Sequence, residues 1–174
     1  MIEVAYEFGG LADFIVGSQQ TEPGDGWPYR DVLAGLHKRL DPAGAAAHIV
    51  QVYDRSYRRT GQLNVTQSAV EVSRLPAVAR SLDRLGRALH ALLPAHRDPM
   101  VEARLRTQGY EEPTYVDVVD LARNLRRIPD ADVRAACAAV AAATKGAIIA
   151  NKKYGDAVSR SAGLSVWFPL VRSD

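Results

Sequence analysis

The stretch DFIVGS, residues 13–18, places three consecutive large apolar residues between a charged residue and a glycine–serine pair. A short apolar run with such boundaries is typical of a strand that is buried on both faces, as in a parallel sheet. The next stretch, QQTEPGDGWPY at residues 19–29, contains two prolines and two glycines and therefore predicts a shaped loop without regular structure. Ligands commonly collect where a buried strand gives way to such a loop.

Helices are predicted along most of the remaining chain. Apolar residues recur at helical spacing, and Asp41 followed by Pro42 is typical of a helix N-terminus. The sequence predicts helices over residues 2–8, 30–40, 42–59, 73–94, 115–127 and 131–150, and further strands over 63–72 and 163–168. Strands separated by helices favour an α/β fold with a mainly parallel sheet. So few strands leave apolar helix faces uncovered, and we therefore expect this sheet to be partial.

Composition limits the classes of protein and of partner. With 174 residues, 47% of them hydrophobic, the chain can bury a core as a single domain. No run approaches the about 18–20 uncharged apolar residues of a membrane span. The formal charge of +2 gives no reason to expect nucleic acid or a membrane as a partner. The single cysteine excludes an internal disulfide.

The residue types that usually carry chemistry are poorly placed for it. Cys137 lies in the alanine-rich run AACAA, which favours packing inside a helix over a nucleophilic role. The pair Asp117 and Asp120, at i and i+3 with Arg123 beyond, is explained by ion pairing on a helix surface. The four histidines have neither metal-ligand spacing nor neighbours typical of an active-site turn: His37, His48, His90 and His96. The sequence therefore predicts no catalytic residue, metal site or cofactor in this chain.

The loop after the first strand carries one candidate recognition site. Asp25 is flanked by Gly24 and Gly26 and is followed by Trp27. The carboxylate could pair with a guanidinium or ammonium group, the indole could cover the stem of that side chain, and the glycines would let the backbone approach closely. An Asp-Gly turn with Trp27 filling part of the core explains the same residues equally well.

Six segments resemble a known family. Residues 1–7 (MIEVAYE), 12–18 (ADFIVGS) and 22–29 (EPGDGWPY) resemble, in order and spacing, the region just downstream of the catalytic cysteine in clostripain-like cysteine peptidases. The later segments are similar to the same family and carry the resemblance across nearly the whole chain: residues 68–73 (SAVEVS), 115–122 (YVDVVDLA) and 163–169 (GLSVWFP). The block around Asp25 is the most specific of the six.

The resemblance implies a caspase-like α/β fold and an endopeptidase that cleaves after Arg or Lys with a His/Cys dyad. The family's His-Gly turn and its Asp-Ala-Cys-Leu-Met type sequence are not found in this chain, and Met1 matches a position a few residues past the nucleophile. We therefore expect residues 1–174 to be the C-terminal portion of a clostripain-like peptidase domain. Such a portion would be inactive alone, and its partners would be the missing N-terminal half and a peptide or protein substrate with basic residues.

Asp25 corresponds, by its position in the resemblance, to an acidic residue of the pocket that binds the basic side chain before the scissile bond. Trp27 and Glu22 would line or edge the same pocket, although packing explains Trp27 and solvation explains Glu22 equally well. Three interpretations follow: an inactive peptidase portion, a non-catalytic module that binds basic peptides or serves as half of a split peptidase, and a gene product without selected activity.

Overall fold

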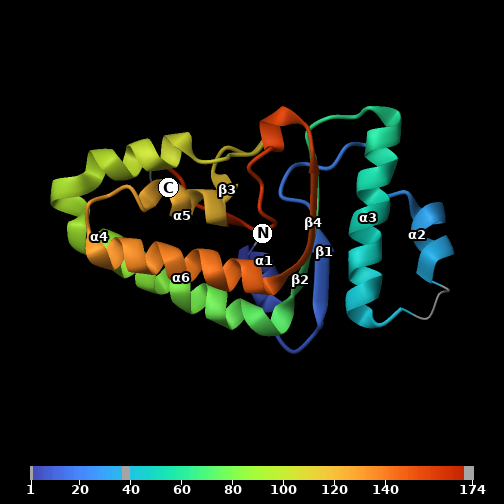
Figure 1. Ribbon diagram of the computed structural model, residues 1–174, viewed down its shortest axis with the longest axis horizontal. Coiled ribbons are helices and arrows are strands. Elements are labelled where there is room, and N and C mark those ends of the chain that lie inside the picture. Colours follow the sequence, from blue (N-terminus) through green and yellow to red (C-terminus); the bar gives the residue numbers. More distant parts are fainter. Residues whose placement is uncertain (1, 37–39, 171–174) are drawn as a thin grey trace.

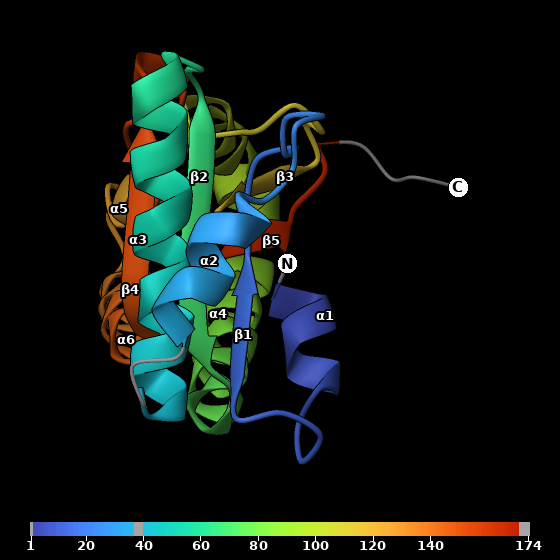
Figure 2. The ribbon, with the colours of Figure 1, turned by 90° about the vertical axis from the view of Figure 1, so that its right-hand side faces the viewer.

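The computed structural model describes residues 2–36 and 40–170, and it contains a three-stranded sheet at the centre of an α/β fold. The strands are β1 (Phe14–Gly17), β2 (Val65–Glu71) and β4 (Ile148–Tyr154), in the order β1-β2-β4. Figure 2 shows β1 at the edge of the sheet nearest to the N-terminal helix. The strand predicted after Asp13 and the strand predicted over 63–72 are therefore confirmed.

Helices lie on both sides of this sheet. Figure 1 shows α3 (Pro42–Thr60) along one face with α2 (Tyr29–Leu36) outside it, while α4 (Leu75–Arg106) and α6 (Ala131–Ala147) lie on the other side. The α3 helix begins as predicted after Asp41, whose carboxylate accepts a 2.7 Å hydrogen bond from a backbone N–H of the first turn. The remaining elements are α1 (Ile2–Glu7), β3 (Tyr115–Asp117), α5 (Val118–Leu125), β5 (Ser165–Trp167) and the 3-10 turns Val72–Arg74 and Asp156–Val158, and β3 pairs with β5 in a second sheet.

The prediction of a mainly parallel sheet is wrong, because every strand pair in the described ranges is antiparallel. After β1 the chain runs back along the sheet through α2, and α3 then runs in the same direction as β1. As a result β2 starts at the end of the sheet where β1 finishes (Figure 2). The register, in which Gly17 faces Ser68 and Phe14 faces Glu71, shows this reversal. An apolar run in the sequence indicates that both faces of a strand are buried. An antiparallel sheet with helices on both sides buries both faces just as a parallel sheet does, so the two give the same sequence pattern.

Several predicted boundaries also move. The helix predicted to stop at residue 94 continues to Arg106 with a kink at His96, where Pro99 lacks the N–H that would bond to the carbonyl of Ala95. The helix predicted over 131–150 ends at Ala147, and residues 148–150 belong to β4 instead. The helix predicted over 30–40 ends at Leu36 among the described residues, and positions 37–39, including His37, lie outside them. Neither α4 nor any other helix of the described chain is both long and apolar enough to cross a membrane.

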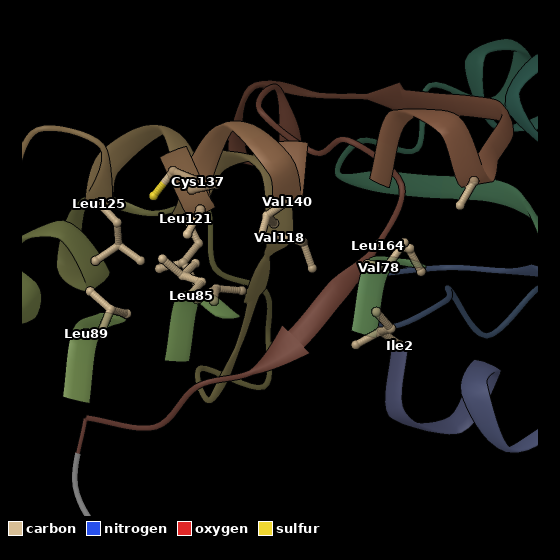
Figure 3. Packing of buried hydrophobic residues seen from close by; sticks show 14 of the residues in the cluster. Ile2, Val78, Leu85, Leu89, Val118, Leu121, Leu125, Cys137, Val140 and Leu164 are labelled. Atoms are coloured by element: carbon tan, nitrogen blue, oxygen red, sulfur yellow. The ribbon is translucent and has the colours of Figure 1, made fainter. Parts of the chain in front are cut away.

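The main hydrophobic core lies between the sheet and the helices α4, α5 and α6. Leu125 and Val140 are fully buried there and meet Leu85 and Cys137 (Figure 3). Burial raises the pKa of the Cys137 thiol to about 11, so this cysteine is protonated and unreactive at neutral pH. The predicted packing role of Cys137 is confirmed. Smaller clusters fill the space between the sheet and α3.

The core predicts the effect of shortening one of its side chains. Leu125→Ala should lower the free energy of unfolding by about 2–5 kcal/mol, because it removes buried methyl groups and leaves a cavity. Leu105→Ala is the matched control, since Leu105 is 64% exposed on α4. Urea unfolding followed by circular dichroism measures both variants. Equal losses in the two variants would contradict the assignment of Leu125 to the core.

Candidate functional site

The candidate loop is anchored where β1 ends. The Oγ1 atom of Thr66 on β2 accepts hydrogen bonds from the backbone N–H groups of Gln19 and Gln20 at 3.0 and 3.1 Å. The hydroxyl of Ser18 lies 2.8 Å from the same oxygen. One buried hydroxyl therefore holds three consecutive residues and sets the direction in which the loop leaves the sheet.

A buried carboxylate fixes the loop from the opposite side. The Nε2 atom of Gln19 donates to Oδ2 of Asp117 at 2.9 Å, and the backbone N–H of Ala162 donates to the same oxygen at 2.6 Å. The backbone N–H of Gly163 donates to Oε1 of Gln19 at 2.9 Å. The other carboxylate oxygen of Asp117 caps α5 by accepting from the backbone N–H of Asp120. Burial raises the pKa of Asp117, although these hydrogen bonds oppose the shift.

The prediction that Asp117 and Asp120 lie on a helix surface is wrong, because both side chains are buried. Asp117 is 0% exposed and Asp120 is 1% exposed. The i, i+3 ion pair of Asp120 with Arg123 does form, but Arg160 also pairs with this carboxylate. The polar spacing alone could not reveal burial, because it is equally typical of an exposed helix face. One feature of the sequence does indicate the helix cap: Asp117 stands directly before an apolar helix, three residues ahead of Asp120, as an N-cap residue would.

Asp25 lies at the exposed tip of a tight turn. The backbone N–H of Gly26 donates to the carbonyl of Pro23 at 2.9 Å, and the positive φ of Gly26, 63°, suits a residue without Cβ. The hydroxyl of Tyr57 on α3 donates to the carbonyl of Gly26 at 2.7 Å and holds the turn in place. Among the described residues Asp25 has no hydrogen-bond or ion-pair partner. Burial first, and then the charges of Asp25 and Glu22, raise the pKa of Tyr57, so the Asp25 carboxylate lies near that phenol.

Glu22 and Trp27 are brought together by a direct contact. The indole Nε1 of Trp27 donates to Oε2 of Glu22 at 2.9 Å. The ring is half-buried and packs against the cluster of Tyr53, Tyr57 and Val65. Glu22 therefore orients Trp27, and Trp27 joins the loop to α3 and the sheet. These contacts give both residues a local structural role, and substrate binding by Glu22, Asp25 and Trp27 stays a prediction.

A shallow hollow of about 340 Å³ runs beside the start of the loop. Its lining includes Val4 of α1, Phe8 directly after that helix, Ile15 and Gly17 of β1, and Gln19. Within the described chain β1 pairs only with β2, so its outer edge faces this hollow without a strand partner. In residues 2–36 and 40–170 there is no group of three or more His, Cys, Asp or Glu side chains that could hold a metal ion.

Solved C11 cysteine proteases have a similar fold. The inactive zymogen C11 protease of Parabacteroides distasonis is 19% identical with a TM-score of 0.67, and the match covers 97% of this chain and 49% of that one. A secreted C11 cysteine protease of Bacteroides thetaiotaomicron is 18% identical with a TM-score of 0.71, covering 95% and 46%. A clostripain of the same organism, in complex with a peptide inhibitor, is 20% identical with a TM-score of 0.59, covering 96% and 68%. The predicted caspase-like α/β class is confirmed.

The sequence agrees with this assignment of the fold. A sequence profile of the clostripain family matches residues 1–170, and the chain therefore belongs to the clostripain family of cysteine proteases. The search of curated proteins gave no match. The chain spans about half the length of the first two proteases above.

The contact between Glu22 and Trp27 predicts how the indole responds to mutation. Glu22→Ala removes the acceptor of a hydrogen bond to a charged group, so it should cost about 1 kcal/mol and speed hydrogen exchange of the Trp27 indole N–H. Glu22→Gln keeps an acceptor oxygen and should restore slow exchange. Two-dimensional NMR resolves this signal from that of Trp167, which serves as the internal reference. Unchanged exchange in Glu22→Ala would show that the contact is not formed in solution.

The position of Asp25 predicts the titration of Tyr57. A raised pKa keeps the phenol protonated in the folded chain after the unfolded chain has begun to ionise, so the free energy of unfolding should fall as the pH rises above about 10. Asp25→Asn removes one of the negative charges and should lower the pKa of Tyr57. NMR of ring-labelled tyrosine measures this pKa. Asp132→Asn, an equal change of charge on α6, should leave it unchanged, and equal shifts in the two variants would place Asp25 away from the phenol.

Proposed function

We propose that this chain supplies the specificity pocket of a clostripain-family endopeptidase that cleaves after Arg or Lys. In this proposal the Asp25 carboxylate binds the basic side chain, and the His/Cys dyad belongs to polypeptide outside these 174 residues. The observation that carries the proposal is a difference between the two carboxylates of the loop. Glu22 is engaged by Trp27, whereas Asp25 is exposed and has no partner in the described chain.

The anchoring of the loop supports this role. Thr66, Gln19 and Tyr57 hold the loop at its start and at its turn, so Asp25 is presented from a fixed backbone. A carboxylate held in this way loses little conformational freedom when it pairs with a guanidinium, which improves affinity. The Trp27 ring beside the turn offers a face for the aliphatic stem of an arginine or lysine.

An exposed carboxylate alone would bind a cation weakly, because water screens the attraction. The outer edge of β1 has no strand partner in residues 2–36 and 40–170, and the apolar side chains of Val4, Phe8 and Leu11 are exposed. Together they supply a surface on which a further polypeptide could pack. Cover over this edge would remove water from the neighbouring loop and strengthen the interaction with Asp25. We therefore propose the other half of a peptidase domain as the partner at this edge.

The chemistry would then be divided between two parts. A cysteine thiolate from the other part attacks the scissile carbonyl, a histidine gives a proton to the leaving amine, and backbone N–H groups stabilise the oxyanion. This chain holds the basic side chain at Asp25 and so places the following peptide bond against the nucleophile. The chain alone is therefore not expected to hydrolyse peptides.

A non-catalytic module that binds basic peptides is the second candidate. It is favoured by one observation, namely that hydrogen bonds within the described chain hold the Asp25 loop both at its start and at its turn. Such a module would bind arginyl or lysyl peptides without help from another polypeptide.

Activity measurements test the proposal directly. The isolated chain should not hydrolyse arginyl or lysyl reporter peptides, whereas a longer polypeptide in which the family's His-Gly and Asp-Ala-Cys motifs precede Met1 should cleave them. In the longer polypeptide, Asp25→Ala should lower kcat/KM for these reporters by about 30- to 5,000-fold, which corresponds to about 2–5 kcal/mol for the loss of a buried charge partner. Asp31→Ala, a nearby exposed aspartate on α2, is the control and should change it little.

Three outcomes would count against this assignment. Unchanged selectivity in Asp25→Ala would return Asp25 to the role of a turn residue. Hydrolysis by the isolated chain that cysteine alkylation abolishes would make Cys137 the nucleophile. Tight binding of an arginyl peptide to the isolated chain, with no activity in the longer polypeptide, would favour the non-catalytic module.

A further inference from the structure

A basic hollow lies on the side of the sheet opposite to α3. It occupies about 420 Å³ between α5, the end of α6, β4 and the segment 159–162. Four cationic side chains from these elements line it: Arg123, Lys145, Lys153 and Arg160. The loop that carries Asp25 packs against α3 on the other face, so the two sites are separate.

Three of these cations are held in place by the protein. Arg123 Nη1 lies 3.1 Å from Oδ1 of Asp120, and Arg160 Nε donates to Oδ2 of the same carboxylate at 3.0 Å. Asp120 is buried, while about half or more of each arginine side chain is exposed, 61% for Arg123 and 49% for Arg160. Lys153 Nζ donates to the carbonyl of Ser161 at 2.7 Å. Each guanidinium has five N–H donors and each ammonium three, so these contacts leave donors free for a ligand.

The hollow concentrates positive charge. Four cations line the hollow, and the carboxylates bonded to its lining are the buried Asp120 and Asp117, so positive charge exceeds negative charge there. Lys145 adds to this charge from the last turn of α6, where it is exposed. Cations that the fold already orients bind an anion with less loss of side-chain freedom than mobile surface lysines do.

We propose that this hollow binds an acidic polypeptide segment through carboxylates spaced along it. The cations are spread around the hollow, because α5, α6, β4 and the segment 159–162 each supply one of them. A compact phosphate can contact only those cations that lie next to one another. Separate carboxylates can instead contact the outer N–H groups of the arginines and the two lysines. This site is independent of the proposed cleavage after Arg or Lys, which concerns a ligand of opposite charge.

Titration of the full chain with a blocked peptide of alternating Glu and Gly tests the proposal. Isothermal titration calorimetry at low ionic strength should give measurable binding, and NMR should show that the peptide shifts the Nε–Hε signals of Arg123 and Arg160. Lys145→Glu should weaken binding by about tenfold or more, because it places a like charge beside the ligand. Lys152→Glu is the matched control, since its neighbour on β4, Lys153, faces the hollow and successive strand residues point to opposite faces.

The outcomes separate the possible explanations. Equal weakening by Lys145→Glu and Lys152→Glu would show attraction to overall charge and overturn the site. Binding of inorganic phosphate without binding of the peptide would overturn the assignment of an acidic polypeptide. If Lys145→Glu unfolds, the shifts of the two arginine signals in the unmodified chain still decide, and their absence at saturating peptide would overturn the proposal.

Discussion

The carboxylate of Asp117 is the constraint on which the arrangement of the candidate site depends. It receives hydrogen bonds from the side chain of Gln19, from the backbone of Ala162 and from the first turn of α5, which are far apart in the sequence. A buried charge is tolerated only when such donors replace its lost hydration. Removing any one donor would leave the charge poorly solvated, so the end of β1, the segment before β5 and the start of α5 must keep their mutual positions.

The three-stranded sheet joins this hydrogen-bonded region to the rest of the molecule. β2 is the central strand, and Thr66 at its start holds the backbone of the loop after β1. Helices cover both faces of the sheet, but among the described residues nothing pairs with the outer edge of β1 (Figure 2). An edge strand with exposed apolar neighbours is a ready surface for another strand or segment. The hydrogen-bonded start of the loop therefore lies directly after the strand at whose edge a partner is proposed.

The sequence predicts the elements of this fold better than their relations. The apolar run at 14–16 and the cap at Asp41 act locally, and the structure confirms both. The relative direction of two strands depends on how often the connecting helices cross the length of the sheet. The apolar run at 14–16 carries no information about that connection. Burial of Asp117 depends on donors about 45 and 98 residues away, Ala162 and Gln19, so no local pattern could reveal it. The motif around Asp25 predicted the loop correctly, whereas its contact with Tyr57 required the three-dimensional structure.

The carboxylates of the described chain differ in their capacity to accept a cation from a ligand. Asp117 is fully buried and its oxygens are occupied, and Asp120 is neutralised by two arginines. Glu22 is engaged by Trp27. Asp25 combines exposure, a fixed backbone and the absence of a partner among the described residues. Because exposed charges interact weakly in water, the proposed preference of Asp25 for basic side chains requires that the ligand or a covering polypeptide removes that water.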